Sequence, residues 1–146
     1  MRLATCRYGG QERVAIESGG RLGLLAADGP SLKQRLAIDP RCRSLEAAVV
    51  SVEHRDVEFL CPRPDAGKII CVGLNYRGHN AEAGAADPAY PSLFPRFADS
   101  QVGHQQPIVA PINSIQFDFE GELAVIIGKP AWRVAEADAL DHVAGY

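Results

Sequence analysis

A break near residue 62, built from prolines and a glycine, divides the sequence into two parts. The stretch Cys61-Pro62-Arg63-Pro64-Asp65-Ala66-Gly67 holds two prolines and one glycine. Proline removes a backbone donor and restricts the residue before it, so neither a helix nor a central strand runs through such a stretch. We therefore predict two domains, residues 1–61 and residues 62–146, with the break as their linker.

The first part has the pattern of a small β-rich domain. Three short segments of strand-like composition, residues 3–7, 13–17 and 21–26, are separated by Gly9-Gly10 and Gly19-Gly20. Glycine pairs of this kind are typical of turns between strands. Ser31 is the expected N-cap of a helix predicted over residues 32–38, and a second helix is predicted over residues 44–52. No residue in this part has a spacing that indicates chemistry.

The second part also alternates strands with short helices. The apolar run at residues 69–73 is typical of a strand buried on both faces. Residues 76–83 predict a short helix that ends at Gly84. Residues 123–127, Leu-Ala-Val-Ile-Ile, predict another strand, followed by a helical turn over residues 135–140 and the start of a further strand at residues 142–146. The predicted fold class is α+β and strand-dominated.

Composition excludes several classes of partner. The formal net charge is −3 and the arginines form no run, so no basic stripe is available for a nucleic-acid backbone. The longest apolar run, residues 123–127, is far too short to span a membrane, and the first residues lack the apolar core of a signal peptide. We expect a cytoplasmic protein with neither a nucleic-acid nor a membrane partner.

The four cysteines form no motif. Cys6, Cys42, Cys61 and Cys71 are scattered and contain no Cys-x-x-Cys pair. This pattern predicts reduced thiols and disfavours a structural zinc site.

His79 and Glu82 form the first candidate site. They are three residues apart in the predicted helix over residues 76–83, and residues with this spacing share a helix face. A carboxylate beside an imidazole orients the ring and raises its basicity, which suits a general base that activates water. An ordinary surface pair has the same spacing, so spacing alone leaves both interpretations open.

Glu120 and Glu122 form the second candidate site. Residues two apart in a strand point to the same face, so the two carboxylates are expected side by side. Like charges that face inward repel unless a cation lies between them, and Mg²⁺ prefers such oxygen ligands. A solvated strand start with solubilising charge remains the alternative, although the apolar residues 123–127 favour entry into a core.

Five motifs, in order, connect the two candidate sites to a known family. They are Lys68 to Tyr76 followed by His79 and Glu82; Pro91-Ser92-Leu93-Phe94; Pro107-Ile108 with Pro111; Asp118-x-Glu120-x-Glu122 running into residues 123–129; and Val143-x-Gly145-Tyr146. Together they resemble the catalytic domain of the fumarylacetoacetate hydrolase family. Residues 1–60 resemble only loosely the variable N-terminal domain of its bacterial members.

The resemblance implies a fold and a set of roles. The fold would be a small N-terminal β-rich domain followed by the front part of a mixed β-sandwich roll. Glu120 and Glu122 would be two of three carboxylates that hold Mg²⁺ or Mn²⁺. His79, supported by Glu82, would activate water for attack on a carbonyl carbon of a small oxo acid of the acylpyruvate or diketo-acid type. Asn75, Tyr76 and Arg96 would contact the substrate.

The resemblance also has departures. Arg96 stands where the family usually has lysine, and a guanidinium does not replace an ammonium as a proton donor. The asparagine–aspartate turn, the arginine–aspartate pair that brings the third metal carboxylate, and a later catalytic lysine have no counterpart in residues 1–146. We therefore expect a truncated catalytic domain, with hydrolase, lyase, isomerase, decarboxylase or hydratase activity and a homodimeric assembly belonging to the complete protein. The alternative is a catalytically silent fragment or an association module.

Overall fold

The computed structural model describes all 146 residues, which fall into two compact units. The first unit combines Met1–Arg63 with Val102–Tyr146, and the second unit is Pro64–Gln101. Short strands outnumber the two α-helices, so the fold is strand-rich α+β, as the sequence predicts. No helix in the structure has the length and apolar character needed to cross a membrane.

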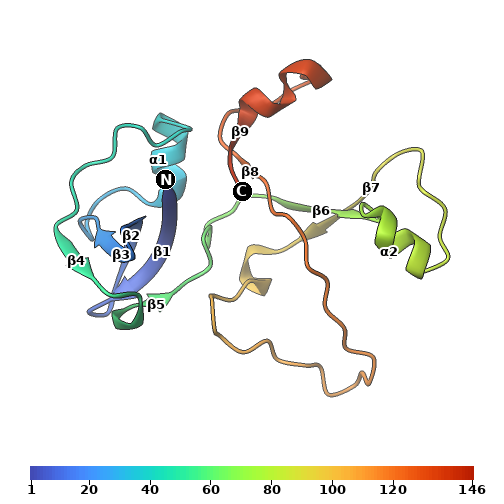
Figure 1. Cartoon of the computed structure of the whole chain (residues 1–146), viewed down its shortest axis with the longest axis horizontal. Coiled ribbons are helices and arrows are strands. Elements are labelled where there is room, and N and C mark those ends of the chain that lie inside the picture. Colours follow the sequence, from blue (N-terminus) through green and yellow to red (C-terminus); the bar gives the residue numbers. More distant parts are fainter. The chain divides into compact units, whose positions relative to one another are not determined.

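A five-stranded antiparallel sheet forms most of the N-terminal part of the first unit (Figure 1). Its strand order is β4-β3-β2-β1-β5. The glycine pairs 9–10 and 19–20 form two-residue turns in which both glycines have positive φ, the geometry that lets tight hairpins follow the strand twist. The strands are β1 Arg2–Tyr8, β2 Gln11–Ser18, β3 Arg21–Leu24, β4 Val50–Val52 and β5 Glu58–Phe59.

Alternation along the strands sends buried side chains into two apolar clusters. The first cluster contains Ala15 and the second contains its neighbour Val14, as expected when successive side chains point to opposite faces of a sheet. Helix α1, Leu32–Ile38, contributes Leu32 and Leu36 to the second cluster. The predicted N-cap is confirmed, because Ser31 Oγ accepts from the Gln34 backbone while the Gln34 side chain accepts from the Ser31 backbone.

The second helix predicted over residues 44–52 is wrong. The Asp39 carboxylate accepts backbone N–H groups just after α1, and Cys42 adopts a left-handed φ of 46°, so the chain turns there. Val49 N then donates to Leu24 O at 2.8 Å, and β4 pairs with β3. Valines at positions 49, 50 and 52 suit an extended edge strand better than a helix, and this β preference prevails.

The second unit contains a two-stranded antiparallel ladder with a helix between its strands (Figure 1). Strand β6, Ile69–Gly73, pairs with β7, Ser92–Arg96, and α2, Arg77–Glu82, lies in the connection. A 3-10 turn, Ala98–Ser100, follows β7. The strand and helix are confirmed. Burial of the strand on both faces is not, because Ile70 is 60% exposed on a ladder of only two strands.

The returning chain, Val102–Tyr146, rejoins the first unit and ends in a small hairpin. Strand β8, Ile126–Ile127, pairs with β9, Val143–Gly145, and a 3-10 helix, Glu136–His142, connects them. Ile126 and Ala144 pack against the second apolar cluster. The last predicted strand is thus confirmed. Of the strand predicted over residues 123–127, only the final two residues are a strand in the structure, namely β8.

Candidate functional site

The first group of predicted site residues lies on the connection between β6 and β7. Leu74 adopts a left-handed φ of 56° immediately after β6, which turns the chain toward α2. Tyr76 is the N-cap of α2 and provides no side-chain cap. Gly84, with a φ of 65°, follows the helix, as the sequence predicts for a glycine stop.

His79 and Glu82 both lie on α2 and both are exposed. Their spacing of one helical turn places them on the same side of this short helix. The backbone carbonyl of His79 accepts from Ala83 N at 2.9 Å, so the histidine sits in a properly hydrogen-bonded turn. Their catalytic roles stay predictions.

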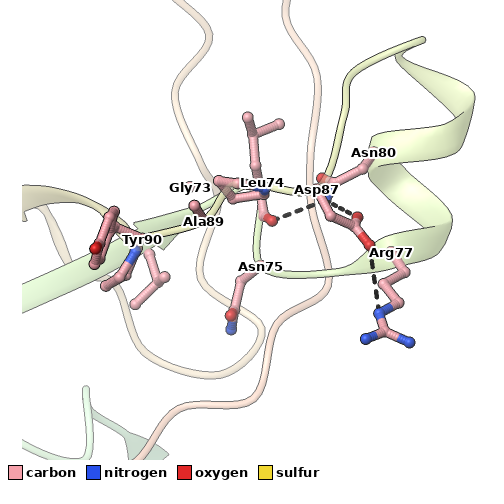
Figure 2. Close-up of a pocket in the computed structure, with 11 residues that line it drawn as sticks. Gly73, Leu74, Asn75, Arg77, Asn80, Asp87, Ala89 and Tyr90 are labelled. Carbon is pink, nitrogen blue, oxygen red and sulfur yellow. Dashed lines mark hydrogen bonds and ion pairs between the residues drawn. The ribbon is translucent and has the colours of Figure 1, made fainter.

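Asn80, between them in sequence, is the residue that sequence reasoning missed. It is 2% exposed, and its carboxamide nitrogen donates to Leu74 O at 3.0 Å and to Asp87 Oδ1 at 2.9 Å (Figure 2). Arg77 Nε lies 3.5 Å from the other carboxylate oxygen of Asp87. The one available signal was asparagine inside a predicted helix, where its side chain commonly bonds to nearby backbone instead of pointing to water.

A cavity of about 310 Å³ opens beside this connection (Figure 2). Asn75, one of the predicted substrate contacts, lies at its wall, and Asn80 lines it as well. Its lining is drawn wholly from the second unit: residues 72–75, Arg77, Asn80 and residues 87–91.

Arg96, the third predicted substrate contact, lies at the end of β7 and is exposed. Its guanidinium donates from Nε to Ser100 Oγ at 3.2 Å and from Nη2 to Ser100 O at 3.1 Å. These bonds hold the side chain against the following 3-10 turn. A carboxylate ligand would therefore compete with Ser100 for the same donors.

The second group, Glu120 and Glu122, belongs to the first unit. Both residues are exposed and lie in an irregular segment that ends where β8 begins at Ile126. The expectation that they project side by side from a strand is therefore wrong for this structure. The physical reason is that residues 107–125 have no partner strand to complete the backbone ladder, and an unpaired segment has no fixed alternation of faces.

The donor chemistry of this segment fits a hard divalent cation, but the number of donors does not complete a site. Carboxylate oxygens are the ligands that Mg²⁺ and Mn²⁺ take. The structure gathers no group of three or more His, Cys, Asp or Glu side chains that could hold a metal ion. Glu120 and Glu122 thus provide at most part of a coordination set.

Comparison with known proteins places residues 68–146 in one family. They match the sequence profile described as Fumarylacetoacetate (FAA) hydrolase C-terminal. Among relatives, the chain is 37% identical over 142 residues to the mitochondrial oxaloacetate tautomerase fahd2 of Xenopus laevis, which covers 91% of this chain and 44% of that protein. It is 42% identical over 106 residues to the mitochondrial oxaloacetate tautomerase FAHD2A of Homo sapiens, covering 71% of this chain and 33% of that protein.

A solved structure is similar over nearly the whole chain. The fumarylacetoacetate hydrolase of the psychrophile Exiguobacterium antarcticum superposes with a TM-score of 0.77 at 29% sequence identity, covering 98% of this chain and 52% of that one. The chain therefore spans about half, or less, of the length of the relatives that it matches.

Proposed function

Because the chain belongs to the fumarylacetoacetate hydrolase family, we propose that it forms part of a divalent-metal-dependent enzyme that acts on small oxo acids. Residues 62–146 would be the front part of the catalytic domain, the mixed β-sandwich roll of this family, and residues 1–61 a separate small domain. The match over residues 68–146 carries the proposal, because that range contains every candidate site residue.

The reaction that we favour is keto–enol tautomerisation of an oxo diacid. Two relatives that cover most of this chain are named oxaloacetate tautomerases, and this supports the same class of substrate here. In such a reaction the C–H bond beside the oxo group breaks, its electron pair forms the carbon–carbon double bond, and a proton reaches the former carbonyl oxygen. The enzyme needs a base at the carbon and stabilisation of negative charge at the oxygen.

Each candidate residue has a place in this chemistry. His79 takes the proton from carbon, and Glu82, one turn away on α2, orients its imidazole. Asn75, which lines the cavity, and Tyr76, at the N-cap of α2, contact the substrate, and Arg96 binds a substrate carboxylate. Glu120 and Glu122 would contribute to holding Mg²⁺ or Mn²⁺, which when bound supplies positive charge at the enolate oxygen.

Carbon–carbon hydrolysis is the second candidate. The similar structure from Exiguobacterium antarcticum is named a fumarylacetoacetate hydrolase, and this supports hydrolysis of an oxo acid as a candidate here. For this reaction His79 would remove a proton from water instead of carbon. The residues are the same, so the substrate decides between the two reactions.

A catalytically silent chain is the alternative from another class. It is favoured because the structure gathers no group of three or more His, Cys, Asp or Glu side chains that could hold a metal ion. Assay of the 146-residue chain separates this alternative from the enzymatic ones.

The test is an ultraviolet assay of oxaloacetate enol decay and of acylpyruvate cleavage, with Mg²⁺ and with a metal-only blank. Catalysis above the blank is expected to fall by about 10²–10⁴-fold in His79→Gln, the usual contribution of a general base. His54→Gln, an exposed histidine of the first unit, is the matched control and keeps wild-type activity. Equal activity in His79→Gln and the control would contradict the proposal, and no activity above the blank in wild type would favour the silent alternative.

A further inference from the structure

Asn80 is the only buried residue of the second unit, although it is polar. An apolar residue at this position would gain from burial without needing any partner, so a buried carboxamide requires an explanation in hydrogen bonds. The carboxamide nitrogen of Asn80 meets that requirement with two side-chain bonds, and the backbone of Asn80 makes two more.

The two side-chain bonds join opposite ends of the connection. Leu74, whose carbonyl accepts the first bond, lies before α2, and Asp87, whose carboxylate accepts the second, lies after it. Both partners are acceptors, so the carboxamide nitrogen must face them and the orientation of the amide is unambiguous. Figure 2 shows both bonds leaving the same nitrogen.

The backbone of Asn80 reinforces the same closure. Asn80 N donates to Tyr76 O at 3.0 Å, and Ala85 N donates to Asn80 O at 2.8 Å. One residue therefore bonds to two positions before it and two positions after it. The connection carries α2 between these attachments, with His79 adjacent to Asn80 in the chain.

Few side chains can make this closure. It needs a short side chain with one atom that carries two hydrogen-bond donors, and the amide nitrogen of asparagine is such an atom. The serine hydroxyl would donate only one hydrogen bond, and an aspartate carboxylate would place an acceptor oxygen against two other acceptors. The Asn80 oxygen itself accepts no hydrogen bond in the structure, although it is buried. The donor side of the amide is therefore what the fold uses.

We propose that Asn80 is a positioning residue: by tying Leu74 to Asp87 it fixes α2 and thereby sets where His79 is presented. The functional part of this inference rests on the proposed role of His79 as the base. The structural part is independent of that role, because it concerns only where the imidazole lies and how firmly the helix is closed.

The structural part is tested on the 146-residue chain by hydrogen exchange of residues 77–85 and by the imidazole resonances of His79, assigned with His79→Gln. In Asn80→Asp, which keeps the shape but removes both donors, we expect faster exchange and a shifted, broadened His79 resonance. In Asn80→Asp with Asp87→Asn, the new amide can donate to the new carboxylate, so partial recovery is expected. Arg77→Ala is the matched control, because it removes the exposed contact to Asp87 while leaving the Asn80 bonds in place.

Unchanged exchange and an unchanged His79 resonance in Asn80→Asp would overturn the proposal, as would equal effects in Arg77→Ala. In active protein, kcat is expected to fall roughly ten- to a hundredfold in Asn80→Asp with KM little changed, in line with a small displacement of the reacting group. Disturbed exchange with unchanged kcat would show a structural role only and would also overturn it. Absence of wild-type activity would count against the proposed function and leave the exchange and resonance results to decide the placement of His79.

Discussion

A β-carbon built on Gly103 would overlap the carbonyl oxygen of Phe59. The returning chain therefore passes directly over the edge strand β5, at a distance that only glycine permits. Two side-chain contacts flank this approach: the His104 and Phe59 rings meet edge to face at 5.9 Å, and Gln106 Nε2 donates to Glu58 Oε1 at 2.6 Å. These contacts attach the segment that leads to Glu120 and Glu122 to the N-terminal sheet.

Gly103→Ala is expected to destabilise the first unit by about 1–3 kcal/mol or more, the usual cost of forcing extra volume into a packed site. The atoms in the way are backbone atoms of Phe59 and Leu60, which cannot swing aside as a side chain would. Urea denaturation measures the difference. Gly121→Ala is the matched control, because its β-carbon meets nothing within 4 Å. Equal stability of the two variants would show that the segment does not lie against β5.

Asp39 makes the first unit sensitive to acid. Burial by itself would raise the pKa of its carboxyl, but backbone N–H donors from Arg41, Arg43 and Ser44 outweigh it and hold the pKa below its ordinary value. A group whose pKa is lower in the folded state stabilises the fold above its unfolded pKa, and this contribution disappears as the pH falls through the folded pKa. We expect the free energy of unfolding to fall as the pH drops below about 4.

Asp39→Asn should be less stable than wild type at neutral pH and lose less on acidification, because its amide does not titrate. Asp141→Asn, an exposed aspartate near the chain's end, is the control and should keep the wild-type acid profile. Thermal unfolding followed between about pH 6 and pH 2 gives the comparison. Parallel pH profiles for wild type and Asp39→Asn would rule out this role for the turn after α1.

Exposed apolar side chains on residues 107–127 are expected to cause self-association. Large apolar surface and unpaired strand edges favour pairing with other chains. Static light scattering should show a mass that rises with concentration, and Ile112→Lys should reduce the rise more than Asn113→Lys, which adds the same charge at the next position. A constant monomer mass at high concentration would contradict this expectation. The exposed residues are Ile108, Val109, Ile112, Ile115, Phe117, Phe119, Leu123, Val125 and Ile127.

Local signals predicted much of the fold correctly. Glycine pairs with positive φ close both N-terminal hairpins, Ser31 caps α1, and Gly84 follows α2. In each case the residue type has a backbone or capping requirement that acts within a few positions. Such requirements can be read from the sequence without knowing the tertiary contacts.

The contacts between segments far apart in the sequence could not be predicted from it. Residues 44–52 avoid the helix because Leu24 and β3 offer an extended partner. Glu120 and Glu122 do not form the predicted strand because no neighbouring strand pairs with their segment. Asn80 was missed because its importance depends on Leu74 and Asp87, which the helical pattern does not bring together. Pairing and side-chain closure are set by contacts between separate segments, so composition and period do not reveal them.

Manganese binding tests the central claim most directly, because Glu120 and Glu122 are proposed to hold the metal. Free Mn²⁺, followed by electron paramagnetic resonance, should decrease when the protein is added, and Glu120→Gln and Glu122→Gln should each weaken that decrease. Binding to the 146-residue chain is expected to be weak, since no third ligand is gathered there and these ions favour near-octahedral oxygen sites. Glu136→Gln, an exposed glutamate of the 3-10 helix, is the matched control and should bind as wild type does. Wild-type binding that is unchanged in both Glu120→Gln and Glu122→Gln would contradict the account.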